Sequence, residues 1–180
     1  MTNLDLLAAE AHANAVAHGF YDNPDPDRLF ALMHAELSEA IQEERSGAPI
    51  DEIVRDWDGE PLGHAGIVVE LADYVLRLLD YAAYRGFAFA GPAPNVPTYE
   101  ELPRLVNALH DLTCDLCRAA LVLGGQGMQK AWNTTDLWII RASIEHVRAF
   151  LEAKGVDLWE VVREKMEYNR TRPYMHGKLY

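Results

Sequence analysis

Two pairs of acidic residues, each at an i, i+3 spacing, are the side chains of this sequence best suited to chemistry. Glu36 and Glu39 form the first pair, and Glu70 and Asp73 form the second. Residues three apart in a helix lie on the same side of it. If the two helices are antiparallel neighbours, the pairs converge, and four carboxylates share a small volume only with protons or cations. Oxygen ligands favour Mg²⁺ or Mn²⁺, and Mg²⁺ commonly works with substrate phosphates.

The first pair interrupts the apolar stripe of its own helix. At about 100° per residue, Met33, Glu36, Ala40 and Glu43 project within roughly 40° of one direction. A carboxylate in such a stripe is costly unless it is paired or bound to a cation. Two explanations therefore fit Glu36, a metal site and a buried salt bridge. Few Lys or Arg residues lie nearby in the sequence to form the salt bridge.

The second pair belongs to a helix with one polar face, in the segment "VELADYVLRLLDYAAYRG". A solvated polar face has the same pattern, so this helix alone does not distinguish a metal site from ordinary solvent exposure. The polar face carries Glu70, Asp73, Arg77, Asp80, Tyr81 and Tyr84.

The histidines argue against one other kind of metal site. Di-iron four-helix bundles use a Glu-x-x-His motif on two of their helices. None of the seven histidines follows a glutamate by three residues. The carboxylate set therefore favours Mg²⁺ over iron.

The C-terminal segment "EKMEYNRTRPYMHGKLY" is basic in an otherwise acidic chain. Lys165 and Asn169 are four residues apart on one helix face, and Arg172 follows at the end of the helix. An anionic phosphate chain needs donors of this kind. Basic residues are also favoured at any helix C-terminus by the helix dipole, so an ordinary basic tail is the alternative.

Length, composition and charge exclude several classes of protein. The 180 residues suffice for one domain with a sizeable core. The net charge of -12 makes nucleic acid and anionic membranes poor partners. No apolar run approaches the roughly 18 residues that span a bilayer, and the N-terminus lacks the basic start and apolar block of a signal peptide. With two cysteines and no export signal, the sequence predicts a cytoplasmic protein.

Apolar periodicity and helix-stop signals predict an all-α protein of six helices, with no convincing strand. Asp25 or Asp27 is expected to cap the second helix, and Asp157 the last, with Glu160 three residues on as in a capping box. Glycine and proline mark the connections between the helices. The predicted helices cover residues 2–18, a second segment ending near Arg45, residues 67–85, 99–123 and 135–153, and a last segment from Asp157 to Pro173.

Four blocks of the sequence resemble those of the MazG-like nucleotide pyrophosphohydrolases, the all-α NTP pyrophosphatase superfamily, and they occur in the order of that family. The blocks are "HGFYDNP", "LMHAELSEAIQEER", "ELADYVLRLLDYA" and "KMEYNRTRPYMHGK". The hallmark of the family is Glu-x-x-Glu, a spacer and Glu-x-x-Asp, which corresponds here to Glu36/Glu39 and Glu70/Asp73. The blocks extend over about 12–86 and 154–180, somewhat over half of the chain.

The resemblance implies an enzyme that hydrolyses a (deoxy)nucleoside triphosphate between its α and β phosphorus atoms, giving the monophosphate and pyrophosphate, for nucleotide-pool clean-up. Mg²⁺, with Mn²⁺ as a substitute, neutralises the phosphates and lowers the pKa of the attacking water. Glu39 is also the candidate catalytic base. The metal ligands implied are Glu36, Glu39, Glu70 and Asp73.

Further expectations follow from the same resemblance. Lys165, Asn169 and Arg172 match positions that contact the nucleotide. Arg77 and Asp80 fit the block "RLLD" and are expected, together with Glu43, to order the site. Because chains of this family usually bury the apolar faces of their short bundle by dimerising, a homodimer is expected.

Two departures from the family pattern stand out. The acidic motifs are 30 residues apart, Ala40 to Val69, a slightly long spacer. Residues 87–153 intervene where "YRG" would usually lead almost directly into the last helix. We expect them to form an inserted helical hairpin that packs on the bundle or across a dimer interface, because an apolar stripe is rarely left in water. The alternative function is a non-catalytic nucleotide-binding or protein-interaction module of the same fold.

Two features outside these blocks have weaker implications. Cys114 and Cys117 form a lone C-x-x-C motif, "CDLC". Zinc would need two more ligands and a redox motif would need a βαβ context, so we expect two reduced cysteines packed on a helix face. Trp57, in the loop between the acidic motifs, is a candidate for stacking on a base.

Overall fold

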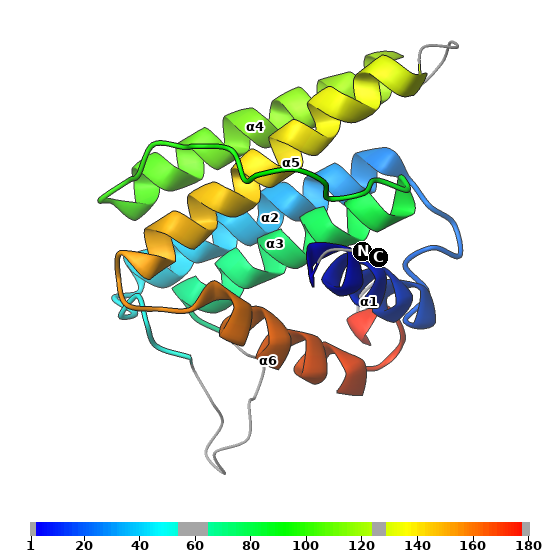
Figure 1. The fold of residues 1–180 in the computed structure, drawn as a ribbon. Coiled ribbons are helices and arrows are strands. Elements are labelled where there is room, and N and C mark those ends of the chain that lie inside the picture. Colours follow the sequence, from blue (N-terminus) through cyan, green and yellow to red (C-terminus); the bar gives the residue numbers. More distant parts are fainter. Residues whose placement is uncertain (1–2, 54–64, 124–128, 178–180) are drawn as a thin grey trace.

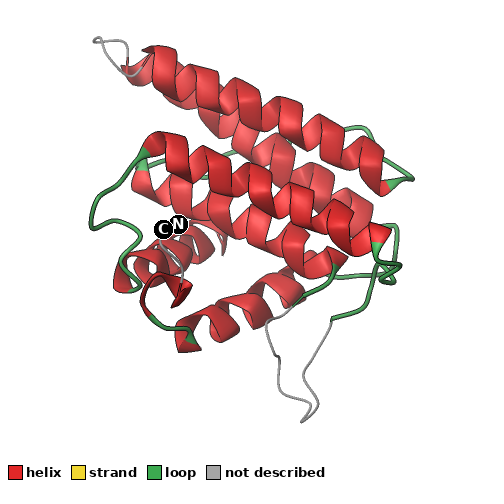
Figure 2. Ribbon diagram, turned by 180° about the vertical axis from the view of Figure 1, so that it is seen from behind, coloured by secondary structure: helices red, strands yellow, loops and turns green. Residues whose placement is uncertain are grey.

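The computed structural model describes residues 3–53, 65–123 and 129–177, and these contain six α-helices and no strand (Figures 1 and 2). The all-α prediction is confirmed. Trp57 lies outside the described residues. A 3₁₀ turn, Tyr174–Gly177, follows the last helix. The helices are α1 (Asn3–Ala17), α2 (Pro26–Arg45), α3 (Ile67–Tyr84), α4 (Leu102–Leu123), α5 (Gln129–Glu152) and α6 (Leu158–Thr171).

Local capping explains where two of the helices begin. The Asp25 side chain accepts a hydrogen bond from the backbone N–H of Asp27 at 3.0 Å, and proline occupies the first turn of α2. The Asp157 side chain accepts one from the backbone N–H of Trp159 at 2.7 Å. Both predicted caps are therefore confirmed. By contrast α5 begins at Gln129, six residues before the predicted start at residue 135.

Helix α3 is the central element of the fold and packs against α1, α2, α5 and α6. Its apolar residues are buried, and Glu70, Asp80 and Tyr81 of its polar face are buried as well. The alternative of a solvated polar face is therefore wrong for this helix, because neighbouring helices cover it on almost every side. Polar groups on α3 must find partners inside the protein.

Helices α4 and α5 form a long hairpin along the side of α2 and α3 that lies opposite α6 (Figure 1). Helix α4 packs on α2, and α5 packs on α3. The hairpin also makes a buried polar contact with α3, in which the hydroxyl groups of Tyr74 and Thr113 lie 2.9 Å apart. The prediction that residues 87–153 pack on the bundle holds for the described part of this segment. Its apolar stripe is buried at Leu102, Leu105, Val106, Leu109 and Leu116.

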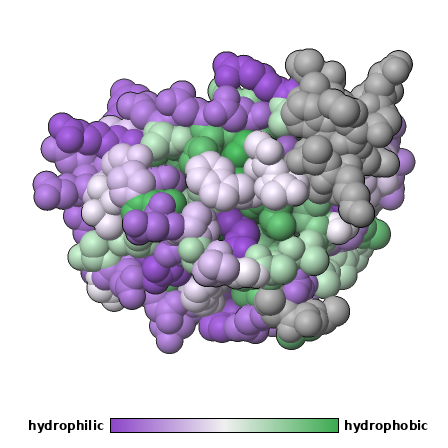
Figure 3. Space-filling model, turned by 45° about the horizontal axis from the view of Figure 1, so that its top comes forward, coloured by the Kyte–Doolittle hydropathy of each residue, from purple (hydrophilic) through white to green (hydrophobic). Residues whose placement is uncertain are grey.

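The exposed apolar residues of the described chain are few and scattered. The face in Figure 3 shows hydrophilic residues along much of its edge, with hydrophobic patches interrupted by polar ones. Single exposed apolar side chains are normal for a folded domain. The predicted homodimer therefore stays a prediction. Among the described residues, no helix combines the length and apolar character that crossing a bilayer requires.

Replacing Leu109 by Ala should test the docking of the hairpin on α2. Leu109 is fully buried, and removing a buried leucine side chain leaves a cavity that costs about 2–5 kcal/mol of stability. Urea denaturation followed by circular dichroism measures this loss. Leu6→Ala is the matched control, because Leu6 is 48% exposed and its truncation should change stability by only about 0.5 kcal/mol. Equal, small effects of the two changes would contradict the observed packing of α4.

Candidate functional site

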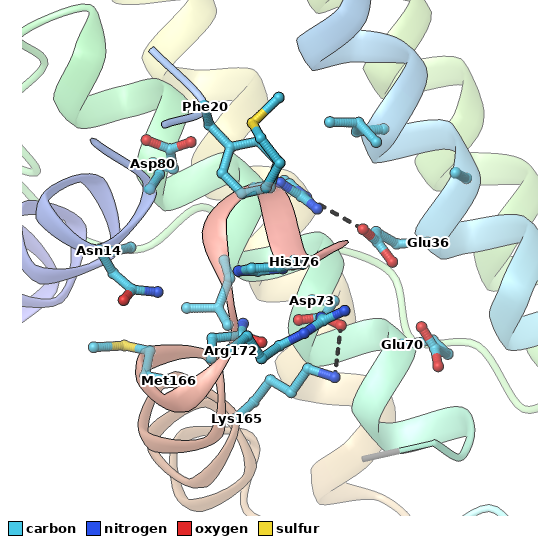
Figure 4. Close-up of a pocket in the computed structure, with 18 of the residues that line it drawn as sticks. Asn14, Phe20, Glu36, Glu70, Asp73, Asp80, Lys165, Met166, Arg172 and His176 are labelled. Atoms are coloured by element: carbon cyan, nitrogen blue, oxygen red, sulfur yellow. Dashed lines mark hydrogen bonds and ion pairs between the residues drawn. The ribbon is translucent and has the colours of Figure 1, made fainter. Parts of the chain in front are cut away.

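A polar cavity lies where α1, α2, α3, α6 and the C-terminal turn meet. Its volume is about 190 Å³. Helices α2 and α3 supply acidic side chains to its wall, and α6 with the residues after it supplies basic and amide side chains (Figure 4). Nine of the ten predicted site residues line this cavity, whereas Glu43 does not.

Three carboxylates converge on one spot in the wall of the cavity. Glu36 comes from α2, and Glu70 and Asp73 come from consecutive turns of α3, which packs against α2. One oxygen atom of each lies within 4.8 Å of the others. Glu36 and Glu70 are only 7% exposed. We call Glu36, Glu70 and Asp73 the acidic trio.

Burial of the acidic trio changes its protonation. Burial, together with the neighbouring Asp73 carboxylate, raises the pKa of Glu36 to about 7 and that of Glu70 to about 8. The Arg77 guanidinium lowers the pKa of Glu36, and the Lys165 ammonium lowers that of Glu70, without cancelling the effect of burial. Near neutral pH Glu36 and Glu70 therefore remain partly protonated, and a bound cation would displace these protons.

Two members of the trio already have cationic partners. Nε of Arg77 lies 3.2 Å from Oε1 of Glu36, and Nζ of Lys165 lies 3.0 Å from Oδ2 of Asp73. The alternative of a buried salt bridge is thus realised for Glu36, with a partner from another helix that lies far away in the sequence. No cation among the described residues lies within salt-bridge distance of Glu70. With its pKa raised to about 8, Glu70 instead keeps a proton near pH 7.

The other two glutamates of α2 lie differently. Glu39 is exposed and lines the cavity, but it does not belong to the group whose oxygens lie within 4.8 Å of one another. Glu43, which was expected to order the site, is half-buried and does not reach the cavity. Seven residues of helix separate it from Glu36, a distance of about 10 Å along the axis. Sharing a face with Glu36 therefore does not bring it to the site.

The opposite wall carries the predicted phosphate-binding residues. Lys165 is 2% exposed, and Arg172 is half-buried at the C-terminal end of α6, with its guanidinium 5.8 Å from the Tyr168 ring centroid. Asn169 also lines the cavity, and its Oδ1 atom is buried without a hydrogen-bond partner in the described structure. A buried amide oxygen of this kind is costly unless a donor meets it. A ligand N–H or O–H group in the cavity would satisfy it.

Asp80 fastens the turn between α1 and α2 to the central helix. Its Oδ1 atom accepts a hydrogen bond from the Tyr21 hydroxyl at 2.9 Å and lies 2.8 Å from Nδ1 of His12. Burial raises the pKa of Asp80, while these two partners lower it. Asp80 thus holds one wall of the cavity through His12 and Tyr21, which the sequence analysis did not consider.

The C-terminal turn closes the cavity by docking on the turn between α1 and α2. The Met175 N–H donates to the His18 carbonyl at 2.8 Å, and the Tyr174 hydroxyl donates to Oδ2 of Asp22 at 2.6 Å. Gly19 has φ +83°, and a Cβ atom there would lie 2.0 Å from the Tyr174 ring. Both its backbone conformation and this close approach therefore require glycine. The contact holds Arg172 beside the cavity.

His176 and Phe20 are cavity residues that the sequence analysis did not single out. His176 has φ 51°, which is uncommon for a residue with a side chain. Burial lowers its pKa to about 3, and the positive charges of Arg172 and Arg77 add to the shift, so the ring is neutral near pH 7. Phe20 packs under the Arg77 guanidinium, 5.2 Å from its ring centroid. Both residues lie within the quoted blocks "HGFYDNP" and "KMEYNRTRPYMHGK", which was the signal available in the sequence.

Comparisons of the chain with protein-family models, with curated proteins and with solved structures found no match. The geometry and charge of the cavity are therefore the basis for assigning a function.

The raised pKa of Glu70 predicts a specific pH dependence of stability in the metal-free protein. Between pH 4.5 and about 8 the folded state keeps a proton that the unfolded chain releases, so stability falls as the pH rises through this range. Glu70→Gln removes this contribution and should make the protein more stable than wild type by roughly 3–5 kcal/mol at pH 8.5, with little difference at pH 4.5. Urea unfolding in EDTA at the two pH values measures it.

Glu44→Gln serves as the control for this measurement, because Glu44 is an exposed residue of α2 outside the cavity. Its unfolding free energies should follow the wild-type pH dependence. If the curves for Glu70→Gln and wild type run parallel from pH 4.5 to 8.5, Glu70 does not titrate as a buried acid.

Proposed function

We propose that this protein is a MazG-like, Mg²⁺-dependent nucleoside triphosphate pyrophosphohydrolase. It would cleave a (deoxy)nucleoside triphosphate between the α and β phosphorus atoms, releasing the monophosphate and pyrophosphate. One observation carries the proposal: a single cavity holds three converging carboxylates, two of them buried, on one wall and Lys165, Asn169 and Arg172 on the other. A metal–triphosphate complex has the two kinds of charge that these walls complement.

The acidic trio suits a hard divalent cation. Its members offer carboxylate oxygens alone, the ligands that Mg²⁺ and Mn²⁺ prefer, and no histidine or cysteine belongs to this group. Glu70 has no cationic partner among the described residues, so a metal ion that binds there would take the place of its proton. Mg²⁺ bound there would supply Lewis acidity toward the phosphate oxygens and lower the pKa of water.

The basic wall would position the substrate. The planar guanidinium of Arg172 can contact two phosphate oxygens at once, while Lys165 provides a compact charge next to Asp73. The unpaired Oδ1 of Asn169 accepts a hydrogen bond from a sugar hydroxyl or base N–H. Together these side chains hold the α-phosphorus in line with an attacking water molecule, which the acidic trio alone does not achieve.

Glu39 is the residue we propose as general base. Glu39 is exposed and lines the cavity outside the acidic trio, so its carboxylate can accept a proton from a water molecule there. Water attacks the α-phosphorus, its proton passes to Glu39, and the bond to the bridging oxygen breaks so that pyrophosphate leaves. The same proposal includes three further expectations: a role in nucleotide-pool clean-up, a hairpin that is an insertion, and a homodimer.

A non-catalytic module of the same fold is the second candidate. The ion pairs Arg77–Glu36 and Lys165–Asp73 favour it, because they neutralise two of the three buried carboxylates without any metal. Such a protein would bind a nucleotide or a partner without turnover. Measuring both binding and product release separates the two candidates.

Pyrophosphate release from a panel of ribo- and deoxynucleoside triphosphates, with Mg²⁺ and with EDTA, tests the proposal. We expect release of pyrophosphate and monophosphate in equal amounts, only with the metal. Glu70→Gln should reduce turnover to background while the protein stays folded, because it removes one carboxylate of the trio. Nucleotide binding without any product, or full activity of Glu70→Gln, would refute the enzymatic proposal.

Arg172→Ala should lower kcat/KM by about 10²-fold, because the transition state loses a positioned charged donor. Arg170→Ala is a matched control two residues away. Arg170 is exposed and pairs with Glu167 and Glu10 outside the cavity, so its loss should leave kcat/KM unchanged. Steady-state kinetics on the best substrate measures both. Equal losses for the two variants would mean that Arg172 acts through general charge and does not contact the substrate.

A further inference from the structure

The C-x-x-C motif of α4 gains two histidine neighbours in the folded chain. His110, Cys114 and Cys117 follow one another at spacings of four and three residues, which places them within roughly 60° on one face of α4. Helix α2, which packs against this helix, contributes His34, and the His34 and His110 rings stack with centroids 5.0 Å apart. All four side chains are partly exposed, so an ion can reach them from solvent.

His34 uses its two ring nitrogens differently. Its Nδ1 atom lies 2.7 Å from Nδ1 of His110, and its Nε2 atom lies 3.9 Å from Sγ of Cys114. Two ring nitrogens at hydrogen-bonding distance share one hydrogen, so one donates and the other accepts. When His34 donates through Nδ1, its Nε2 atom presents a lone pair on the side of the thiol. Metal-binding histidines are typically held in this way, by a partner on the second nitrogen.

The spacing of these atoms suits a tetrahedral zinc ion. Bonds of about 2.1 Å to nitrogen and 2.3 Å to sulfur place the two ligand atoms roughly 3.6 Å apart. The observed separation of 3.9 Å between His34 and Cys114 is close to this value. Cys117 lies one turn further along the same face and can supply a second sulfur. Among the described residues, the acidic trio is the group of ligand atoms that all lie within 4.8 Å of one another, and His34, Cys114 and Cys117 do not meet this distance. The Cys117 side chain must therefore move towards the other two when zinc binds.

We propose that His34, Cys114 and Cys117 form a Zn²⁺ site between α2 and α4, with His110 orienting His34 and a water molecule completing the coordination. Thiolate and imidazole ligands select zinc, whereas Mg²⁺ prefers the oxygen atoms of the acidic trio. Binding releases the two thiol protons to solvent and transfers no electron. The ion links the hairpin to the helix that carries Glu36. The site is independent of the proposed pyrophosphohydrolase activity.

Titration of the full-length, reduced protein with Co²⁺ alone tests this site. Cobalt in a tetrahedral thiolate site gives a sulfur-to-cobalt charge-transfer absorption, which carboxylate sites do not produce. Wild type should show this absorption, saturating at one cobalt per chain, and one equivalent of Zn²⁺ should abolish it. Cys114→Ser should remove most of it, and His110→Gln should weaken binding by about 10-fold, because it removes the partner of a ligand.

Two controls separate this site from other features of the chain. His146→Gln should leave the titration unchanged, because His146 is a buried histidine of α5 that contacts the Pro97 carbonyl. Glu70→Gln should also leave it unchanged, since the acidic trio contributes no sulfur. Circular dichroism confirms that each variant folds. Absence of the charge-transfer absorption in wild type, or a titration of His34→Gln that matches wild type, would overturn the proposal.

Discussion

The rest of the structure depends on one constraint, the burial of three carboxylates between α2 and α3. Taking these groups out of water is costly unless opposite charges or hydrogen-bond donors surround them. Arg77 of α3 and Lys165 of α6 meet this need for Glu36 and Asp73. The position of α6 is therefore tied to the charge on α3, and Lys165, which pairs with Asp73, also belongs to the opposite wall of the cavity. The same ion pairs therefore stabilise the packing of the helices and set the charge of the cavity.

The sequence predicted the helices and the convergence of Glu36, Glu70 and Asp73, because both leave local, periodic signals, but it also placed Glu39 in that group. Apolar residues at helical spacing and the caps Asp25 and Asp157 mark the elements. Glu36 stood out because it interrupted an apolar stripe, and the i, i+3 spacing paired Glu70 with Asp73. The polar face of α3 was more ambiguous, because the same pattern describes a solvated helix and one whose polar groups meet partners inside the protein. Only the packing of α1, α2, α5 and α6 around α3 shows that its polar groups meet partners inside the protein.

Contacts between distant segments were beyond prediction. No periodicity indicates that His34 lies beside Cys114, that Arg77 pairs with Glu36 or that His12 and Tyr21 meet on Asp80. Each depends on the angle and register at which two helices pack, which a single sequence does not reveal. Glu43 illustrates the reverse error, because it shares a helical face with Glu36 but lies too far along the axis. The spacing of residues predicts on which side of its helix a side chain lies. It does not predict how far along the neighbouring helix that side chain packs.

The docking of Tyr174 on Gly19 has a consequence for the order in which the molecule folds. The hydrogen bond from Tyr174 to Asp22 joins residues 152 positions apart. Closing a loop of that length costs chain entropy before the contact contributes anything, so contacts of this separation form late. The helical bundle and its acidic trio are therefore expected to assemble first, and the cavity to close last. A folding intermediate would possess the carboxylates without Arg172 held beside them, and ligand recognition would appear only in the final step.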